Sequence, residues 1–232
     1  MKIIRLYFRY FFSISNLIVI SLLLIFLFIS YFISLDNINI QLSYEEVLKY
    51  YFENSIYFTK LILLIFSCFL FMKLHNEKNE YIINITISAG YSKKDNFKKM
   101  IFSYLTILLF MIIILFIGFI VIGYLKLAYF SIDILYFRSF FYLYLMMIYY
   151  GLITYLLQSI FNNQFIFIGT IVLFVISEFI LEVEGDFKFI YLYFFPNFNN
   201  DIFIINELYI ILVIFIVYIL NMRIYLSKDL KS

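Results

Sequence analysis

The chain has 232 residues, of which 66% are hydrophobic and only 14% charged, and its mean hydropathy is +1.02. Soluble domains are roughly 45–50% apolar and about 25% charged, so the composition argues against a soluble enzyme or a disordered linker. A net charge of +2 gives no basic surface for nucleic acid. One cysteine and one histidine exclude an internal disulfide and a histidine-rich metal or catalytic cluster. We therefore expect a protein embedded in a lipid bilayer, without a cofactor.

The N-terminal residues predict a short amphipathic helix. Lys2, Arg5 and Arg9, followed by Ser13 and Asn16, recur at spacings of three and four, which places them on one helical face. Such a helix would lie in the membrane interface, with its cations among lipid headgroups. The alternative is a plain basic flank of the first span.

Six apolar stretches qualify as membrane-crossing helices, each of which needs about 20 mostly apolar residues. They cover approximately residues 16–34, 57–72, 100–124, 140–157, 165–181 and 206–222. The first is longer than the apolar region of a signal peptide and lacks a good cleavage site, so we expect it to be retained. The predicted fold class is therefore all-α: a polytopic membrane protein with a single transmembrane domain over residues 1–232.

The basic residues predict the orientation of these six spans. Twelve of the 17 Lys and Arg fall on one side: three near the N-terminus, six between residues 73 and 99, and three in the C-terminal tail. Cytoplasmic loops carry such an excess, so both termini are predicted to be cytoplasmic. The abundant Ile, Phe, Tyr, Asn and Lys have AT-rich codons, which indicates a low-GC bacterial genome and hence the bacterial plasma membrane.

The cytoplasmic segment 73–99 carries the most informative pattern. A polar stripe at spacings of three and four predicts a short helix: Glu77, Glu80, Asn84 and Ser88. The apolar residues off this stripe are Tyr81, Ile82, Ile85 and Ala89. Gly90 would end the helix, because glycine adopts the left-handed conformation at little cost.

Ser92 and Asp95 then form a helix-start pattern, so a second helix is expected to run into the third span. Its first turns carry Lys93, Lys94, Lys98 and Lys99. Together these signals predict a helix–glycine–helix elbow that can dock into a partner protein. The alternative is a solvated loop whose lysines only set the orientation of the spans.

This layout resembles the ABC-2 type permease subunits of ATP-binding-cassette transporters, which have a basic interfacial N-terminal helix, six spans and a long cytoplasmic connection between spans two and three. Glu80 looks like the family's Glu after span two, the turn 88–93 resembles its small-residue turn with Lys93 in place of Arg, and Lys98 or Lys99 resembles its closing Lys. In that family the elbow is the coupling helix that contacts the ATPase. The resemblance thus implies an ATPase-coupling role for Glu77, Glu80, Gly90, Ser92, Lys93 and Lys94.

The resemblance also implies partners. It suggests a permease that forms a homodimer, or a heterodimer with a second permease, and exports a peptide, a bacteriocin or a hydrophobic antibiotic. No phosphate-binding loop is present, so ATP hydrolysis is expected in a separate ATP-binding subunit and not in this chain. One alternative is a non-transporting membrane protein for bacteriocin immunity or maturation. Another alternative is an FtsX-like permease, because residues 89–93 of this chain also resemble the post-glycine turn of that family. That family, however, usually has four spans and a large external domain.

Two further residues are candidates for a substrate or gating role. Glu178 lies within the predicted fifth span, and acids inside a membrane are functional candidates; its place near the outer end also fits an acid that only reaches the headgroups. Pro196 lies in the external segment 182–207, which resembles the re-entrant hairpin before the last span of such permeases. The alternative for that segment is an interfacial loop without a gating role.

The charge distribution yields a test of the topology. A reporter fused after Ser232, or within residues 73–99, should report the cytoplasm, and one inserted at Asn199 should report the exterior, because the basic side stays inside. Paired alkaline phosphatase and fluorescent-protein fusions make the measurement. An external C-terminus would contradict the six-span arrangement.

Overall fold

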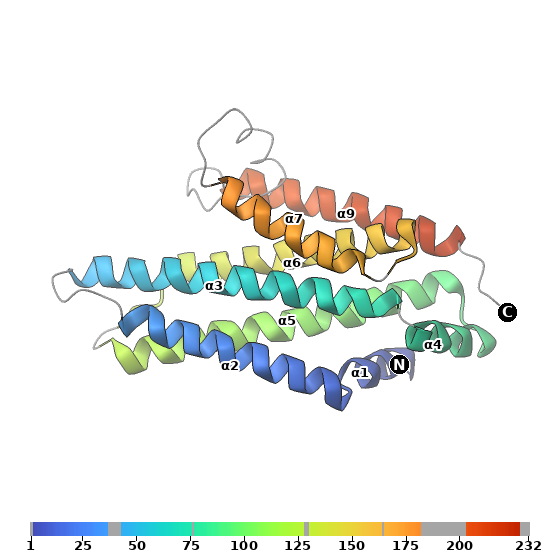
Figure 1. The fold of residues 1–232 in the computed structure, drawn as a ribbon, viewed down its shortest axis with the longest axis horizontal. Helices are drawn as coiled ribbons and strands as arrows, with labels where there is room; N and C mark the ends of the chain where they lie inside the picture. The colour runs from blue at the N-terminus through green and yellow to red at the C-terminus, as the bar shows by residue number, and fades with distance from the viewer. Residues whose placement is uncertain are drawn as a thin grey trace.

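The apolar runs form long helices, because within lipid a helix pairs all backbone groups inside its own segment. In a computed structural model of the chain, the structure describes residues 2–36, 43–75, 77–127, 130–163, 165–181 and 203–227. These residues are helical almost throughout (Figure 1). The elements are α1 (Lys2–Phe11), α2 (Ile14–Asp36), α3 (Tyr44–Met72), the 3₁₀ turn η1 (Lys73–His75), α4 (Glu77–Ser88), α5 (Lys93–Lys126), α6 (Ile134–Phe161), α7 (Ile166–Leu181) and α9 (Phe203–Ser227).

Five of these helices are long and apolar enough to cross a membrane: α2, α3, α5, α6 and α9. They correspond to five of the six predicted spans, and the all-α class is confirmed. The sixth predicted span, 165–181, is also a helix, but the 16 residues of α7 rise only about 24 Å, less than the roughly 30 Å of a hydrocarbon core. In the part of the chain that the structure describes, five helices are thus candidate spans, as in a polytopic membrane protein.

Several helices extend beyond the apolar windows that predicted them. Helix α3 begins at Tyr44, well before the predicted residue 57, because Ser43 and Glu46 form a capping box. The Glu46 amide donates to the Ser43 hydroxyl at 3.4 Å, and the Ser43 amide donates to the Glu46 carboxylate at 2.8 Å. These bonds satisfy backbone donors that a helix start leaves unpaired, so the helix continues through polar residues.

The N-terminal helix, the elbow and the end of α9 share one end of the bundle (Figure 1). Helix α1 packs against α5, with Ile3, Tyr7 and Phe11 buried and Arg5 and Arg9 exposed. The exposed arginines agree with the predicted basic face.

Asn16 departs from that predicted polar face, because it is fully buried. Its amide donates to the carbonyl oxygens of Tyr10 at 3.3 Å and Phe11 at 2.8 Å, and its carbonyl accepts from the Lys73 ammonium. The last carbonyls of a helix have no partner within the helix. The Asn16 amide therefore serves the end of α1, where the chain turns into α2.

Close contact between α3 and α6 holds the centre of the bundle. Ser67 donates to the Met147 carbonyl at 2.6 Å, and Gly151 lies against the ring of Phe71. A Cβ added at Gly151 would lie 2.2 Å from a ring carbon of Phe71 and 2.8 Å from the Ser67 hydroxyl oxygen. Small residues at such contacts let helices approach closely in lipid, where no hydrophobic force drives them together.

This contact predicts a stability difference between two glycine substitutions. Gly151→Ala should lower the free energy of unfolding by about 1–3 kcal/mol, because the buried Phe71 ring has to move. The matched control is Gly169→Ala in α7, where an added Cβ meets nothing within 4 Å. The buried Cys68, the chain's single cysteine, reports unfolding in detergent through its reaction with a thiol-specific fluorophore. Equal thermal midpoints for the two variants would contradict the packing described here.

Candidate partner-docking surface

A buried asparagine positions the start of the elbow. Asn79 in α4 is fully buried, and its amide donates to the Leu74 carbonyl in η1 at 2.6 Å. Ile83 and Thr86 continue the same buried face, which packs against α5. Helix α4 is therefore held along one side by polar and apolar contacts together.

The opposite side of α4 is exposed. Glu80, Asn84 and Ser88, three members of the predicted polar stripe, face solvent as expected. Two apolar residues beside them are exposed as well: Tyr81 at 68% and Ile85 at 43%. The predicted polar stripe is therefore exposed as expected, but Tyr81 and Ile85 do not form a buried face opposite to it. The buried face of α4 consists of Asn79, Ile83 and Thr86.

Gly90 ends α4 in the manner predicted. Its φ is +85°, in the left-handed region. The Gly90 amide donates to the Ile87 carbonyl at 2.9 Å, and the Tyr91 amide donates to the Thr86 carbonyl at 3.2 Å. This pair of bonds is a Schellman motif, which satisfies the last carbonyls of a helix and sets the direction of the exit.

Ser92 starts α5 directly afterwards, again as predicted. It has extended backbone, and its hydroxyl accepts from the Asp95 amide at 3.1 Å. The same hydroxyl donates to the Asp95 carboxylate at 2.8 Å. A helix end and a helix start thus meet within four residues, so the geometry of the elbow is determined by the backbone hydrogen bonds at Gly90 and Tyr91 together with the side-chain bonds of Ser92.

The lysines of the first turns of α5 differ in exposure. Lys94 and Lys98 are exposed, whereas Lys93 and Lys99 are half-buried. The Lys99 ammonium lies 4.6 Å from the centre of the Tyr91 ring, in a cation–π contact. Eight of the exposed residues of α4, the turn and the start of α5 make up what we name the elbow surface: Glu80, Tyr81, Asn84, Ile85, Ser88, Gly90, Lys94 and Lys98.

A buried polar network connects the elbow to the rest of the bundle. Asn96, in the first turns of α5, is fully buried. It accepts from the Tyr7 hydroxyl of α1 at 3.0 Å and donates to the Tyr225 hydroxyl of α9 at 3.2 Å. Burial raises the pKa of Tyr7 well above its usual value, with a further contribution from Tyr225, so its phenol stays protonated and can donate.

Phe97 extends this connection through ring contacts. Its centre lies 5.1 Å from that of Tyr225 and 5.5 Å from that of Tyr218, both in α9, and 6.5 Å from that of Tyr155 in α6. Sequence reasoning missed Asn96 and Phe97 as site residues. The only local signal for a buried position was that Asn96 and Phe97 interrupt a run of lysines.

The predicted site residues are thus brought together in part. Glu80, Gly90, Ser92, Lys93 and Lys94 lie within one elbow. Glu77 begins α4 and Glu178 lies in α7, but the side chains of both lie outside the described residues, as does the whole of Pro196. Among the side chains that are described, no three His, Cys, Asp or Glu come together in a way that could hold a metal ion.

The chemistry of the elbow surface suits the binding of a protein partner. It combines a carboxylate, two ammonium groups and two exposed apolar side chains on a rigid turn. Such a mixture of an apolar anchor and a charged rim is typical of protein–protein interfaces. In comparisons with known proteins, no family model, no curated protein and no solved structure matches the chain.

The network predicts that one hydroxyl holds α1 in place. Tyr7→Phe removes the donor to Asn96 and leaves a buried carbonyl without that bond. We expect amide hydrogens of α1 to exchange about fivefold faster, because a hydrogen bond contributes roughly 1 kcal/mol. Tyr81→Phe, which removes an exposed hydroxyl of α4, is the control and should leave α1 unchanged. Hydrogen exchange by mass spectrometry makes the comparison, and an unaltered α1 in Tyr7→Phe would contradict the role of this bond.

Proposed function

We propose that the chain is the membrane-spanning permease subunit of an ATP-binding-cassette transporter of the ABC-2 type. The observation that supports the proposal is the position of the elbow surface. It is exposed, and it adjoins Asn96 of α5, which is hydrogen-bonded to α1 and to α9. A partner that pushes on this surface would move three helices of the bundle together. That is the mechanical property that transmission of an ATP-driven movement requires.

The proposal assigns the rest of the arrangement as follows. The end of the bundle with α1, the elbow and the end of α9 faces the cytoplasm, consistent with its excess of basic residues. Helix α7 acts as the sixth span, with the membrane locally thinned around it. ATP binding and hydrolysis occur in a separate soluble subunit, and this chain is not itself an enzyme.

The proposed cargo is a peptide, a bacteriocin or a hydrophobic antibiotic, and the permease works as a homodimer or with a second permease. Among the side chains that the structure describes, those buried within the bundle are apolar or neutral, including Ser67, Thr154 and Asn221. Neutral hydroxyls and amides suit an amphipathic cargo better than an ion, whose carriers place charged residues in the membrane.

The test exchanges single residues of the elbow in the full chain, purified in mild detergent from its native membranes. Wild type should retain a P-loop ATPase, identified by mass spectrometry, and the complex should hydrolyse ATP. Gly90→Val should lose both, because a positive φ costs an L-residue about 1–2 kcal/mol and a β-branched one more. Open space surrounds Gly90, so the effect reports backbone geometry and not a clash.

Ala89→Val is the matched control, since it adds the same side chain at the exposed preceding residue. It should keep the ATPase, and both variants should insert at normal levels. The double reversal Lys93→Glu/Lys94→Glu should weaken the complex in a salt-dependent way, with a reporter after Ser232 checking that orientation is unchanged. Retention of the ATPase by Gly90→Val would refute the coupling role, and absence of any ATPase from wild type would favour a non-transporting membrane protein.

A further inference from the structure

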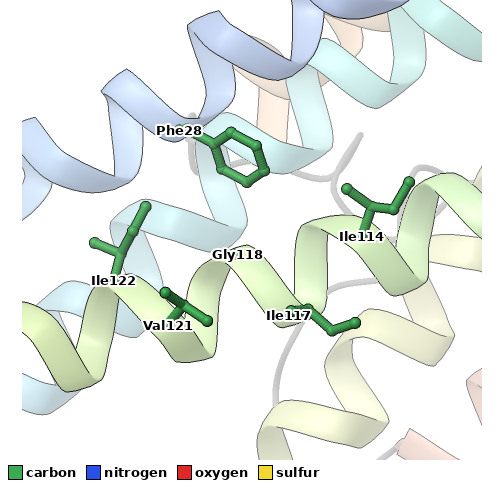
Figure 2. A pocket seen from close by; sticks show the side chains of 6 residues that line it. All are labelled: Phe28, Ile114, Ile117, Gly118, Val121 and Ile122. Carbon is green, nitrogen blue, oxygen red and sulfur yellow. The ribbon is translucent and has the colours of Figure 1, made fainter.

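A groove on the outer surface of the bundle runs between α2 and α5. Figure 2 shows its six lining residues, with the ring of Phe28 directed from α2 toward α5. The lining consists of Phe28, Ile114, Ile117, Gly118, Val121 and Ile122, and the groove has a volume of about 340 Å³. Ile117 and Val121 are half exposed, so the groove opens toward the membrane.

The lack of a side chain at Gly118 lets Phe28 of α2 reach α5 beside the groove. A Cβ at this position would lie 2.1 Å from a ring carbon of Phe28, so only glycine lets the ring approach α5. Branched side chains before and after Gly118 in α5 line the groove: Ile114, Ile117, Val121 and Ile122. The result is a shaped depression in a surface that is otherwise an ordinary lipid-facing helix.

The Lys126 ammonium lies next to this depression. Lys126 is one helical turn beyond Ile122 on α5, and its ammonium lies 3.8 Å from the centre of the Phe32 ring. Phe32 is in turn four residues beyond Phe28 on α2. Because α2 and α5 run in the same direction here, the cation lies about 6 Å beyond Ile122, the last lining residue of the groove, at the end of α5.

We propose that this groove binds one acyl chain of an anionic phospholipid, whose phosphate pairs with the Lys126 ammonium. The charge of Lys126 matches a phosphate, and lysines near helix ends extend to the headgroup level. The stretch from Ile114 to Ile122 is about 12 Å long, so a volume of 340 Å³ accommodates a single hydrocarbon chain.

The selectivity of the groove for one lipid over another would come from the lipid headgroup and not from the acyl chain. An acyl chain that moves from bulk lipid into the groove gains little hydrophobic free energy, because both environments are apolar. The groove beside Gly118 orders the chain. The charge of Lys126 favours an anionic lipid over zwitterionic phosphatidylcholine, whose choline ammonium offsets the charge of its phosphate. The bound lipid would thereby cover the seam at which Phe28 meets α5.

The experiment uses the full chain in phosphatidylcholine nanodiscs with a minor fraction of phosphatidylglycerol that carries a photoactivatable diazirine midway along one acyl chain. After irradiation, mass spectrometry should find adducts concentrated on residues 114–122. Lys126→Gln should lower this labelling about fivefold, as expected for one basic residue near an anionic headgroup, and Lys126→Arg should restore it. The same diazirine in phosphatidylcholine should label the segment less at equal mole fraction.

A pair of tryptophan variants tests the groove itself. Val121→Trp fills the groove and should reduce labelling, whereas Ile113→Trp, on a lipid-facing residue outside the lining, should leave it unchanged. Labelling spread evenly over the exposed residues of α2 and α5, or equal for the two lipids, would overturn the proposal. Chain-to-chain adducts at Ile117 in place of lipid adducts would overturn it in favour of a second copy.

Discussion

The side-chain amide of Asn96 is the interaction on which the elbow end of the molecule depends. It is buried without solvent, so both its donor and its acceptor require partners, and these come from helices at opposite ends of the chain: Tyr7 in α1 and Tyr225 in α9. An unpaired amide at such a site would cost about 1–3 kcal/mol. The position of α5 is therefore linked to two other helices at Asn96, four residues after Ser92, and the exposed turn is held in place through that link.

The same requirement operates inside the bundle, where side chains bond to backbone carbonyls of neighbouring helices. Tyr51 donates to the Phe119 carbonyl at 2.8 Å, Asn221 to the Leu152 carbonyl at 2.9 Å, and Tyr144 to the Leu105 carbonyl at 3.2 Å. Aromatic packing accompanies these bonds, as in the stack of Tyr51 on Phe119 with ring centres 4.8 Å apart. Hydrogen bonds and close packing take the place of the hydrophobic force that is absent between helices in lipid.

Local features of the fold could be predicted from sequence, because their physical causes are local. Apolar length indicates a spanning helix, Gly90 indicates a helix end, and Ser92 with Asp95 indicates a helix start; the structure has all three. Features that depend on tertiary partners were not predictable. No pattern links Asn96 to Tyr225, 129 residues away. The periodicity of α4 did not identify its buried face, because Asn79 is polar and its amide has its partners outside α4, at Leu74 in η1 and Met100 in α5. Asn16 was misplaced for the same reason, since an amide that serves a helix end looks identical in sequence to an exposed one.

The central contact between α3 and α6 has a consequence for synthesis in the cell. Ser67 and its acceptor Met147 are 80 residues apart, an interval of about 4–16 s at roughly 5–20 residues per second. During that time α3 has a hydroxyl in the membrane without its final acceptor. Serine and threonine tolerate this wait, because they can bond to a carbonyl one turn back in their own helix, as Thr59 does with the Ser55 carbonyl at 2.6 Å. The buried amide of Asn221 lies in α9, which is synthesised after α6, so it enters the membrane when its acceptor at Leu152 has already been made.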